Sequence, residues 1–283
     1  MTQVSEKDIA SIKDWLAQEP TLPKDFEDIM IKKFLFSCHC SLERTKRCIE
    51  NFCSNRANMP EVFGSRDPLS TAMKNAFNST AVSTYMIGDK EEIMIHRLMS
   101  TDNFDFYNNL KSFSLQSDHW LRQKKEVLPE HHIVVLDIKE YTLMIVARSN
   151  VFYFQKFLTF LLEAMPVRLK QVHVVNCPSF YEYLYGLVKG ALPQEIRDII
   201  HFHTDHMGLH KFVDKKYLPA EYDGDAESMV AQSNYWVTEI NDQRKFYLNN
   251  DLWKADLNKK IKNTNNNPVE TTMSGSFRTL AID

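Results

Sequence analysis

The start of the chain alternates apolar and polar positions with the period of an α-helix. Ile9 and Leu16 share the apolar face of a first predicted helix, which ends before Pro20. A second predicted helix covers 26–35, and a third begins after Ser41, whose short hydroxyl side chain suits an N-cap. The pattern therefore predicts a small helical region at the N-terminus.

Beyond residue 90 the pattern changes to short apolar runs separated by segments of helical length. Strands that alternate with helices imply crossover connections and a largely parallel sheet. Runs that are apolar at every position suit strands covered on both faces. The predicted strands are 93–98, 133–138, 172–175 and 199–202, and the predicted helices are 104–126, 149–164, 179–190 and 206–213.

These patterns predict an α/β fold with a mixed, largely parallel sheet flanked by helices and preceded by a small all-helical domain. The predicted domains are a helical N-terminal domain over 1–85, an α/β domain over 86–246 and a polar C-terminal tail over 247–283. A chain of 283 residues is long enough to bury a substantial core.

Composition excludes several classes of function. The seven glycines do not fall into the spacing of a dinucleotide-binding or P-loop motif, where backbone N–H groups must approach a phosphate closely. The formal net charge is −3, from 34 Lys and Arg against 37 Asp and Glu, so the basic face that nucleic-acid binding requires is not expected.

The N-terminus is charged and lacks the apolar core of a signal peptide. No apolar run approaches the roughly 18 residues that span a bilayer. We therefore expect a soluble protein of the cytoplasm, monomeric and with reduced thiols, although peripheral association with membranes is compatible with this composition.

Three clusters invite a catalytic or metal-binding interpretation. Cys38-His39-Cys40 lies in a helix–turn–helix pattern, whereas structural zinc sites usually place paired cysteines on turns. His201 and His203 would share one face of a strand, a position more typical of hydrogen-bonded neutral histidines. Cys177 follows a strand but lacks the nearby arginine of a phosphatase loop. We expect no catalytic residue, no metal site and no cofactor, and hence no enzyme.

The most unusual feature is the apolar character of two predicted helices. Residues 151–165 are aromatic or aliphatic over most of the helix circumference, and 180–192 repeat the excess. A surface helix needs only one apolar stripe. The excess fits either ordinary core packing or a cavity for an apolar ligand, and the pattern alone does not separate the two.

Several segments together resemble the CRAL-TRIO family of lipid-transfer proteins, in the branch of cellular retinaldehyde-binding protein and α-tocopherol transfer protein, and most closely its insect members. The resemblance covers nearly the whole chain. It rests on Leu22-Pro23 and Lys33-Phe34-Leu35, on Ser41-Leu42-Glu43-Arg44, on Leu136-Asp137-Ile138, on residues 166–180, on Ile200-His201-Phe202-His203, on residues 218–225, and on the tail segment Met273-Ser274-Gly275-Ser276-Phe277-Arg278.

The resemblance implies a sheet floor and a mobile lid helix that enclose one small hydrophobic ligand, which is handed over at membranes without chemical change. Retinoids, tocopherols and carotenoids are the implied ligand class. The alternatives are a lipid-dependent interaction or regulatory protein, and a phospholipid or phosphoinositide transfer protein. The implied floor and wall residues are Leu136, Leu143, Phe157, Phe160, Leu161 and Met165, and the implied lid residues are Tyr181, Leu184, Leu187, Val188, Leu192, Ile196 and Ile200.

Relatives that bind phosphoinositides carry a basic cluster beside the lid, which Arg168, Lys170 and Arg197 match here. Glu195 and Ile199 stand where tocopherol-transfer relatives have basic residues, which weakens the expected capture of a phosphate headgroup. In a second departure, an aspartate, residue 223, replaces the first glycine of the family's Tyr-Gly-Gly motif.

Overall fold

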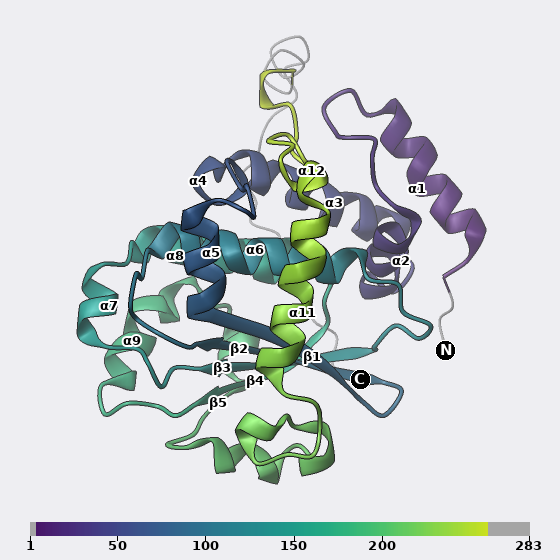
Figure 1. Ribbon diagram of the computed structural model, residues 1–283. Helices are drawn as coiled ribbons and strands as arrows, with labels where there is room; N and C mark the ends of the chain where they lie inside the picture. Colours follow the sequence, from purple (N-terminus) through teal and green to yellow (C-terminus); the bar gives the residue numbers. More distant parts are fainter. Residues whose placement is uncertain (1–3, 260–283) are drawn as a thin grey trace. The chain divides into compact units, whose positions relative to one another are not determined.

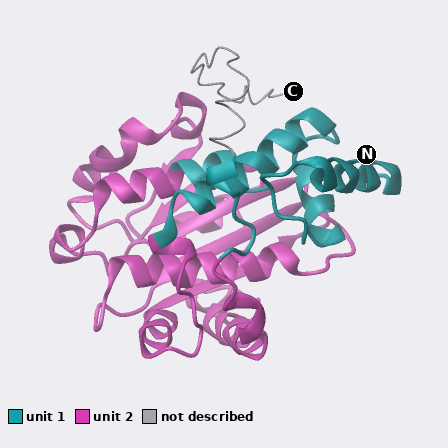
Figure 2. Cartoon of the chain, turned by 90° about the horizontal axis from the view of Figure 1, so that it is seen from above, with its two compact units in different colours: residues 1–60, 159–166, 251–283 teal, residues 61–158, 167–250 magenta. Residues whose placement is uncertain are grey.

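The computed structural model describes residues 4–259 of the chain (Figure 1). Backbone contacts divide the chain into two compact units, coloured separately in Figure 2. The first unit consists of 1–60, 159–166 and 251–283, and the second of 61–158 and 167–250. The sequence-based domain boundaries at 85 and 246 stay a prediction, and the family-like tail segment at 273–278 lies outside the described residues.

Residues 4–59 of the first unit form three helices, α1 (Glu6–Gln18), α2 (Asp28–Ser37) and α3 (Leu42–Ala57), which confirms the predicted helical region. The Ser5 and Asp8 side chains cap the start of α1 reciprocally. The predicted cap on α3 is confirmed, because the Ser41 hydroxyl accepts a hydrogen bond from the Arg44 amide at 3.4 Å.

Aromatic rings form the core of this unit. Phe52 on α3 packs edge-on against Phe34 at 5.4 Å between centroids, and its ring also lies 5.9 Å from Phe160 and 6.2 Å from Trp253. Three cysteines share the same core, since Cys38, Cys48 and Cys53 are at most 3% exposed. Cys48 therefore packs as a small apolar residue, and its thiol faces the Ala164 carbonyl oxygen at 3.5 Å.

The second unit contains a five-stranded sheet with the order β1-β2-β3-β4-β5. β1 pairs antiparallel with β2, and the other three pairings are parallel, so the predicted largely parallel sheet is confirmed. The strands are β1 (Thr80–Ile87), β2 (Glu91–Leu98), β3 (His131–Asp137), β4 (Leu169–Val175) and β5 (Ile200–Phe202).

β1 is the strand that the sequence analysis missed. Its sequence mixes threonine and serine with apolar residues, so no apolar run marks it. Two side chains of α11 (Met229–Asp242) satisfy its outward amides: the Val82 amide donates to the Ser233 hydroxyl at 3.2 Å, and the Thr84 amide donates to the Gln232 side-chain oxygen at 2.6 Å. The free edge of this strand is therefore occupied by a helix.

Helices cover both faces of the sheet. Figure 1 shows α6 above the strands and the 3₁₀ segments that follow β5 below them. The predicted helix over 206–213 is a 3₁₀ helix, His206–Lys211. The remaining elements are α4 (Pro60–Phe63), α5 (Thr71–Ser79), α6 (Phe106–Arg122), α7 (Leu143–Ala147), α8 (Val151–Ala164), α9 (Tyr181–Val188), the 3₁₀ helix Lys189–Ala191, α10 (Gln194–Arg197), the 3₁₀ helices Lys215–Tyr217 and Ala220–Tyr222, and α12 (Arg244–Tyr247).

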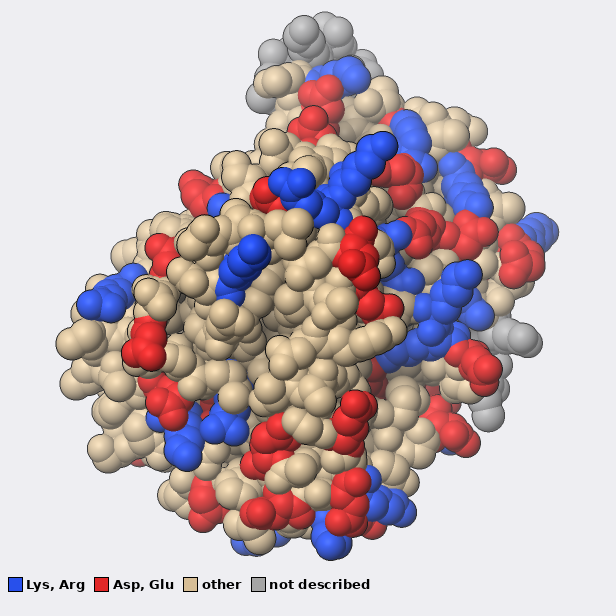
Figure 3. Space-filling model, in the orientation of Figure 1, with Lys and Arg blue, Asp and Glu red and all other residues tan. Residues whose placement is uncertain are grey.

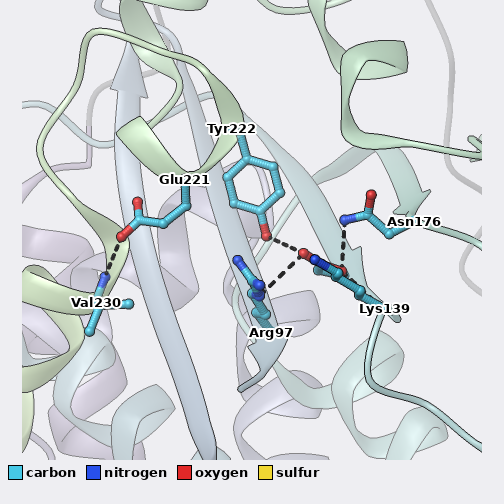
Figure 4. Close-up of polar contacts among 7 residues, drawn as sticks. Arg97, Lys139, Asn176, Glu221, Tyr222 and Val230 are labelled. Carbon is cyan, nitrogen blue, oxygen red and sulfur yellow. Dashed lines mark hydrogen bonds and ion pairs between the residues drawn. The ribbon is translucent and has the colours of Figure 1, made fainter. Parts of the chain in front are cut away.

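A buried carboxylate ties the carboxyl ends of three strands together. Figure 4 shows the side chains of Tyr222, Arg97 and Asn176 pointing toward one another. All three contact the Asp137 carboxylate, which is 1% exposed. The Tyr222 hydroxyl and the Asn176 amide donate to it at 2.9 and 3.0 Å, and the Arg97 guanidinium lies at 3.5 Å. Asp223, the residue after Tyr222, adopts a φ of +55°, so an aspartate occupies a left-handed turn position that usually favours glycine.

Candidate ligand-binding site

The two faces of the sheet differ in how completely they are buried. On the face toward the 3₁₀ segments, the interior strands contribute Ile93, Ile95, Ile133 and Val135, which are at most 2% exposed. These residues form a core cluster with Leu209, Val213 and Leu218 from the 3₁₀ segments and the loops beside them. This face is a closed, well-packed core.

The opposite face is apolar but incompletely buried, and we call it the open face. The pairing register places its interior side chains in two rows. Residues 94, 134, 96 and 136 are half-buried, and Val172 and Val174 are 8% and 9% exposed. Side chains in the middle of a sheet beneath helices normally lose all their accessible surface. The members of the open face on β2 to β4 are Met94, His96, Val134, Leu136, Val172 and Val174.

Aromatic side chains stand over part of this face. The Phe113 ring on α6 meets the His96 ring edge-on at 5.4 Å between centroids, and its other side contacts Phe157 of α8 at 6.1 Å. Phe157 is buried, with 2% of its surface exposed, as expected for a wall residue. The strands therefore supply a floor, and α6 and α8 supply part of a wall.

A buried polar cluster closes the amino end of the open face. Glu92 on β2 is 1% exposed, pairs with Lys125, and accepts a hydrogen bond from the Trp120 indole at 3.1 Å, while His132 lies at 3.7 Å. Burial alone raises the pKa of Glu92, but Lys125 and His132 together lower it below its usual value. The Glu92 carboxylate is thus held ionised, and this end is filled by polar contacts.

Helix α9 is apolar yet unburied. It carries three tyrosines, two leucines and a valine in eight residues, and none of its residues is buried. Tyr181 and Tyr185 pack on Phe202 of the edge strand at 5.2 and 5.1 Å between ring centroids. The Gln155 amide of α8 donates to the Leu187 carbonyl oxygen at 2.6 Å. A helix that is mostly apolar and lacks full cover fits a lid better than a core element.

The structure brings together only part of the predicted ligand site. Leu136 lies on the open face, while Leu143 on α7 is 57% exposed. Phe160, Leu161 and Met165 group with the first unit, where the Phe160 ring contacts Phe52. The predicted lid residues include two buried side chains, Leu192 and Ile196, and five half-buried ones: Tyr181, Leu184, Leu187, Val188 and Ile200.

Sequence reasoning missed His96, Met94, Val134, Phe113 and Phe202. Two of these residues could have been found from the alternation of side chains along β2. Because Ile93 and Ile95 lie on the core face, residues 94 and 96 must lie on the other face. The sequence pattern did not show which residues of α6 face the sheet.

The predicted basic cluster is only partly available to an anion. The Lys170 ammonium group is paired with Glu91, which offsets its charge. Arg168 and Arg197 are half-buried, and the Arg168 amide donates to the His132 ring at 3.2 Å. A phosphoinositide site at these residues therefore stays a prediction.

The two histidines noted in the sequence lie in a stack with a third. His173 lies between His201 and His203, with ring centroids 5.1 and 5.2 Å away, and its Nδ1 is 3.0 Å from Nε2 of His203. Phe212 covers the stack at 4.7 Å from His173. Among residues 4–259, no group of three or more His, Cys, Asp or Glu side chains is arranged to hold a metal ion.

This stack predicts a pH-dependent stability. Burial, with smaller contributions from His203 and His201, lowers the pKa of His173 from 6.5 to about 4. Between pH ~4 and pH ~6.5 the unfolded chain binds more protons at this histidine than the folded chain does. The contribution of His173 to the free energy of unfolding is therefore complete above pH ~6.5 and is lost as the pH falls through ~4. Urea midpoints measured from pH 7.5 to 4.5 should decline less steeply in His173→Gln than in the wild type. Equal slopes for the variant and the wild type would contradict the lowered pKa of His173.

Residues 93–224 match the family model of the CRAL/TRIO domain, and residues 2–73 match that of the Pinta-like UBA domain. Residues 93–224 are thus similar to the CRAL/TRIO domain, and the helical region before them is similar to a UBA domain. Within residues 4–259, no helix is both long and apolar enough to cross a bilayer.

Among curated proteins, the chain is similar to the alpha-tocopherol transfer protein-like proteins of Homo sapiens and Pongo abelii, each 25% identical over 226 residues. The Mus musculus protein of the same name is 24% identical over 233 residues. The match covers 78% of this chain but only 65% of the human and orangutan proteins. In the mouse comparison it covers 80% of this chain and 67% of the mouse protein. The crystal structure of Sfh5 aligns with a TM-score of 0.47 at 13% identity, covering 85% of this chain and 96% of that one.

Proposed function

We propose that this protein binds one small hydrophobic molecule of the retinoid, tocopherol or carotenoid class and carries it between membranes without changing it chemically. The observation that supports this most directly is the open face. Met94, His96, Val134 and Leu136 on the interior strands are only half-buried on one side of the sheet, whereas the isoleucines and valine on the other side (Ile93, Ile95, Ile133 and Val135) are at most 2% exposed. An incompletely covered apolar face of this kind, with few polar groups, suits an apolar ligand.

The energetics of such a site are favourable. Enclosing about 400 Å² of ligand surface at about 25 cal/mol/Å² contributes about 10 kcal/mol before ordering costs. A molecule bound this way dissolves poorly in water, so exchange requires α9 to move while the protein touches a membrane.

The surface near the proposed lid fits a membrane contact. Leu143 and Met144 on α7, Phe152 on α8 and Tyr183 on α9 are between 56% and 84% exposed. Figure 3 shows that uncharged side chains make up much of the visible face and that acidic side chains gather at its lower end, over the segments after β5. Exposed apolar side chains can enter the interface of a bilayer. We propose a monomer that works in the cytoplasm and binds membranes transiently.

Two measurements test the proposal. Native mass spectrometry of the purified protein should show one bound lipid-like molecule, whose mass identifies it. A vesicle-to-vesicle assay with fluorescent retinol or tocopherol should then show transfer that rises with protein concentration. A bound lipid without accelerated transfer would favour the regulatory alternative, and a protein that never binds a lipid would refute the proposal.

The contact between α8 and α9 predicts a faster-exchanging variant. Gln155→Met removes the hydrogen bond to the Leu187 carbonyl with little change in volume, and one such bond contributes about 1 kcal/mol. We expect transfer between vesicles to accelerate by about fivefold. Lys156→Met, the exposed neighbour on the same helix, serves as the matched control and should leave the rate unchanged. A wild-type rate in Gln155→Met would show that this contact does not restrain the lid.

A further inference from the structure

One polar side chain lies among the apolar ones of the open face. His96 belongs to β2, an interior strand, where it pairs with Val82 of β1 and Leu136 of β3. Beyond the Glu92 cluster, the other interior positions on this face are methionine, leucine and valine. A histidine in this setting stands out, because polar groups are costly to place on an apolar surface unless they find a partner.

Within the described residues, His96 has no hydrogen-bond or ion-pair partner. The His96 ring contacts the ring of Phe113 edge-on. The side chain is half-buried rather than buried, so its ring keeps accessible surface beneath the helices that cover the sheet. The imidazole is therefore placed to meet a molecule that occupies the space above the floor.

The charge state of the His96 ring limits which ligand groups can bind to it. Burial lowers the pKa of His96 to about 4, and the opposing effect of Asp137 does not restore it. Asp137 itself points to the core face, where it is held by Tyr222, Asn176 and Arg97. At neutral pH the His96 ring is uncharged and presents one N–H donor and one acceptor nitrogen.

We infer that His96 is the polar anchor of the bound ligand, and that the ligand is an apolar molecule with an uncharged hydroxyl group at the end that reaches the sheet floor. This inference rests on the proposed function and narrows its ligand class. A hydroxyl can pair with either ring nitrogen, whichever carries the proton. A carboxylate or phosphate would bring an unpaired charge onto an apolar floor. A pure hydrocarbon would leave the imidazole unsatisfied, which costs binding free energy.

The test compares ligand pairs that differ only in this hydroxyl group. Retinol and its deoxy analogue, and α-tocopherol and its deoxy analogue, are loaded from vesicles into the full chain and quantified by native mass spectrometry. The wild type should prefer the alcohol by about tenfold, the effect of one buried hydrogen bond. In His96→Leu the preference should fall close to one, with the hydrocarbon bound at least as well as before. His96→Gln, which keeps a donor and an acceptor, should restore part of the preference.

A second measurement needs no variant. The ring ¹⁵N resonances of His96 in the wild type should shift when retinol is loaded and stay in place when the deoxy analogue is loaded. Three results would each overturn the anchor role while leaving the carrier function intact. They are equal loading of alcohol and hydrocarbon by the wild type, an unchanged preference in His96→Leu, and ring resonances that do not shift when retinol is loaded. If the wild type takes up neither member of either pair, the anchor role and the proposed ligand class both fail.

Discussion

Leu136→Trp is expected to reduce ligand loading at least tenfold while the protein stays folded. Leu136 lies on the open face, in the row that also holds His96 and Val174, and its side chain is half-buried. An indole at this position would occupy space above the floor that the proposed ligand uses. In a fully packed core the same enlargement would cost about 1–3 kcal/mol of stability.

The measurement pairs native mass spectrometry for ligand occupancy with a urea unfolding curve. Leu69→Trp is the matched control, since it makes the same chemical change at a residue that is 42% exposed in the loop before α5. It should alter neither occupancy nor stability. A Leu136→Trp protein that is destabilised by several kcal/mol and still loads ligand would show that the open face is packed core, and would refute the proposed site.

Arg66→Met is expected to have the largest effect on stability. The Arg66 guanidinium donates to the Asp118 carboxylate at 2.6 Å and to the Ser114 hydroxyl at 3.3 Å, and both charged side chains are at most 3% exposed. Removing the arginine leaves a buried carboxylate without its cation, which typically costs about 3–5 kcal/mol. The free energy of unfolding, measured in urea, should fall by about that amount.

Two further variants separate the buried charge from the loss of packing. Combining Arg66→Met with Asp118→Leu should recover a large part of the loss, because no unpaired charge remains. Lys215→Met disrupts an ion pair with Asp225 whose two side chains are 61% and 57% exposed, and it should cost less than about 1 kcal/mol. A double variant as unstable as the single one would mean that packing of the Arg66 stem dominates.

Much of the fold could be predicted because the strands and helices are marked by local patterns. The four apolar runs became β2 to β5, and the Ser41 cap and the stop before Pro20 bound two of the N-terminal helices. β1 could not be recognised, because what stabilises it is distant in sequence. Its amides are satisfied by Gln232 and Ser233, about 150 residues further along the chain.

The candidate site was harder to predict than the fold. The segment that became α8 is apolar over most of its circumference, so its pattern does not show which residue faces which neighbour. Phe157 contacts Phe113 of the sheet unit, whereas Phe160 contacts Phe52 of the helical unit, so Phe160→Asp would perturb an aromatic core directly. Leu143 is exposed because α7 is a single short helix that buries one residue, Ile145.

The way α11 covers β1 has a consequence for the behaviour of the protein at high concentration. An uncovered outer strand offers its amides to any extended peptide, including another copy of the same chain, and so can seed fibrous aggregates. Here Ser233 and Gln232 already accept from two of those amides, and the Ser233 hydroxyl is itself fixed by donating to Gln116 of α6 at 3.1 Å. Molecules of this protein at high concentration are thereby protected from joining sheet to sheet along this strand.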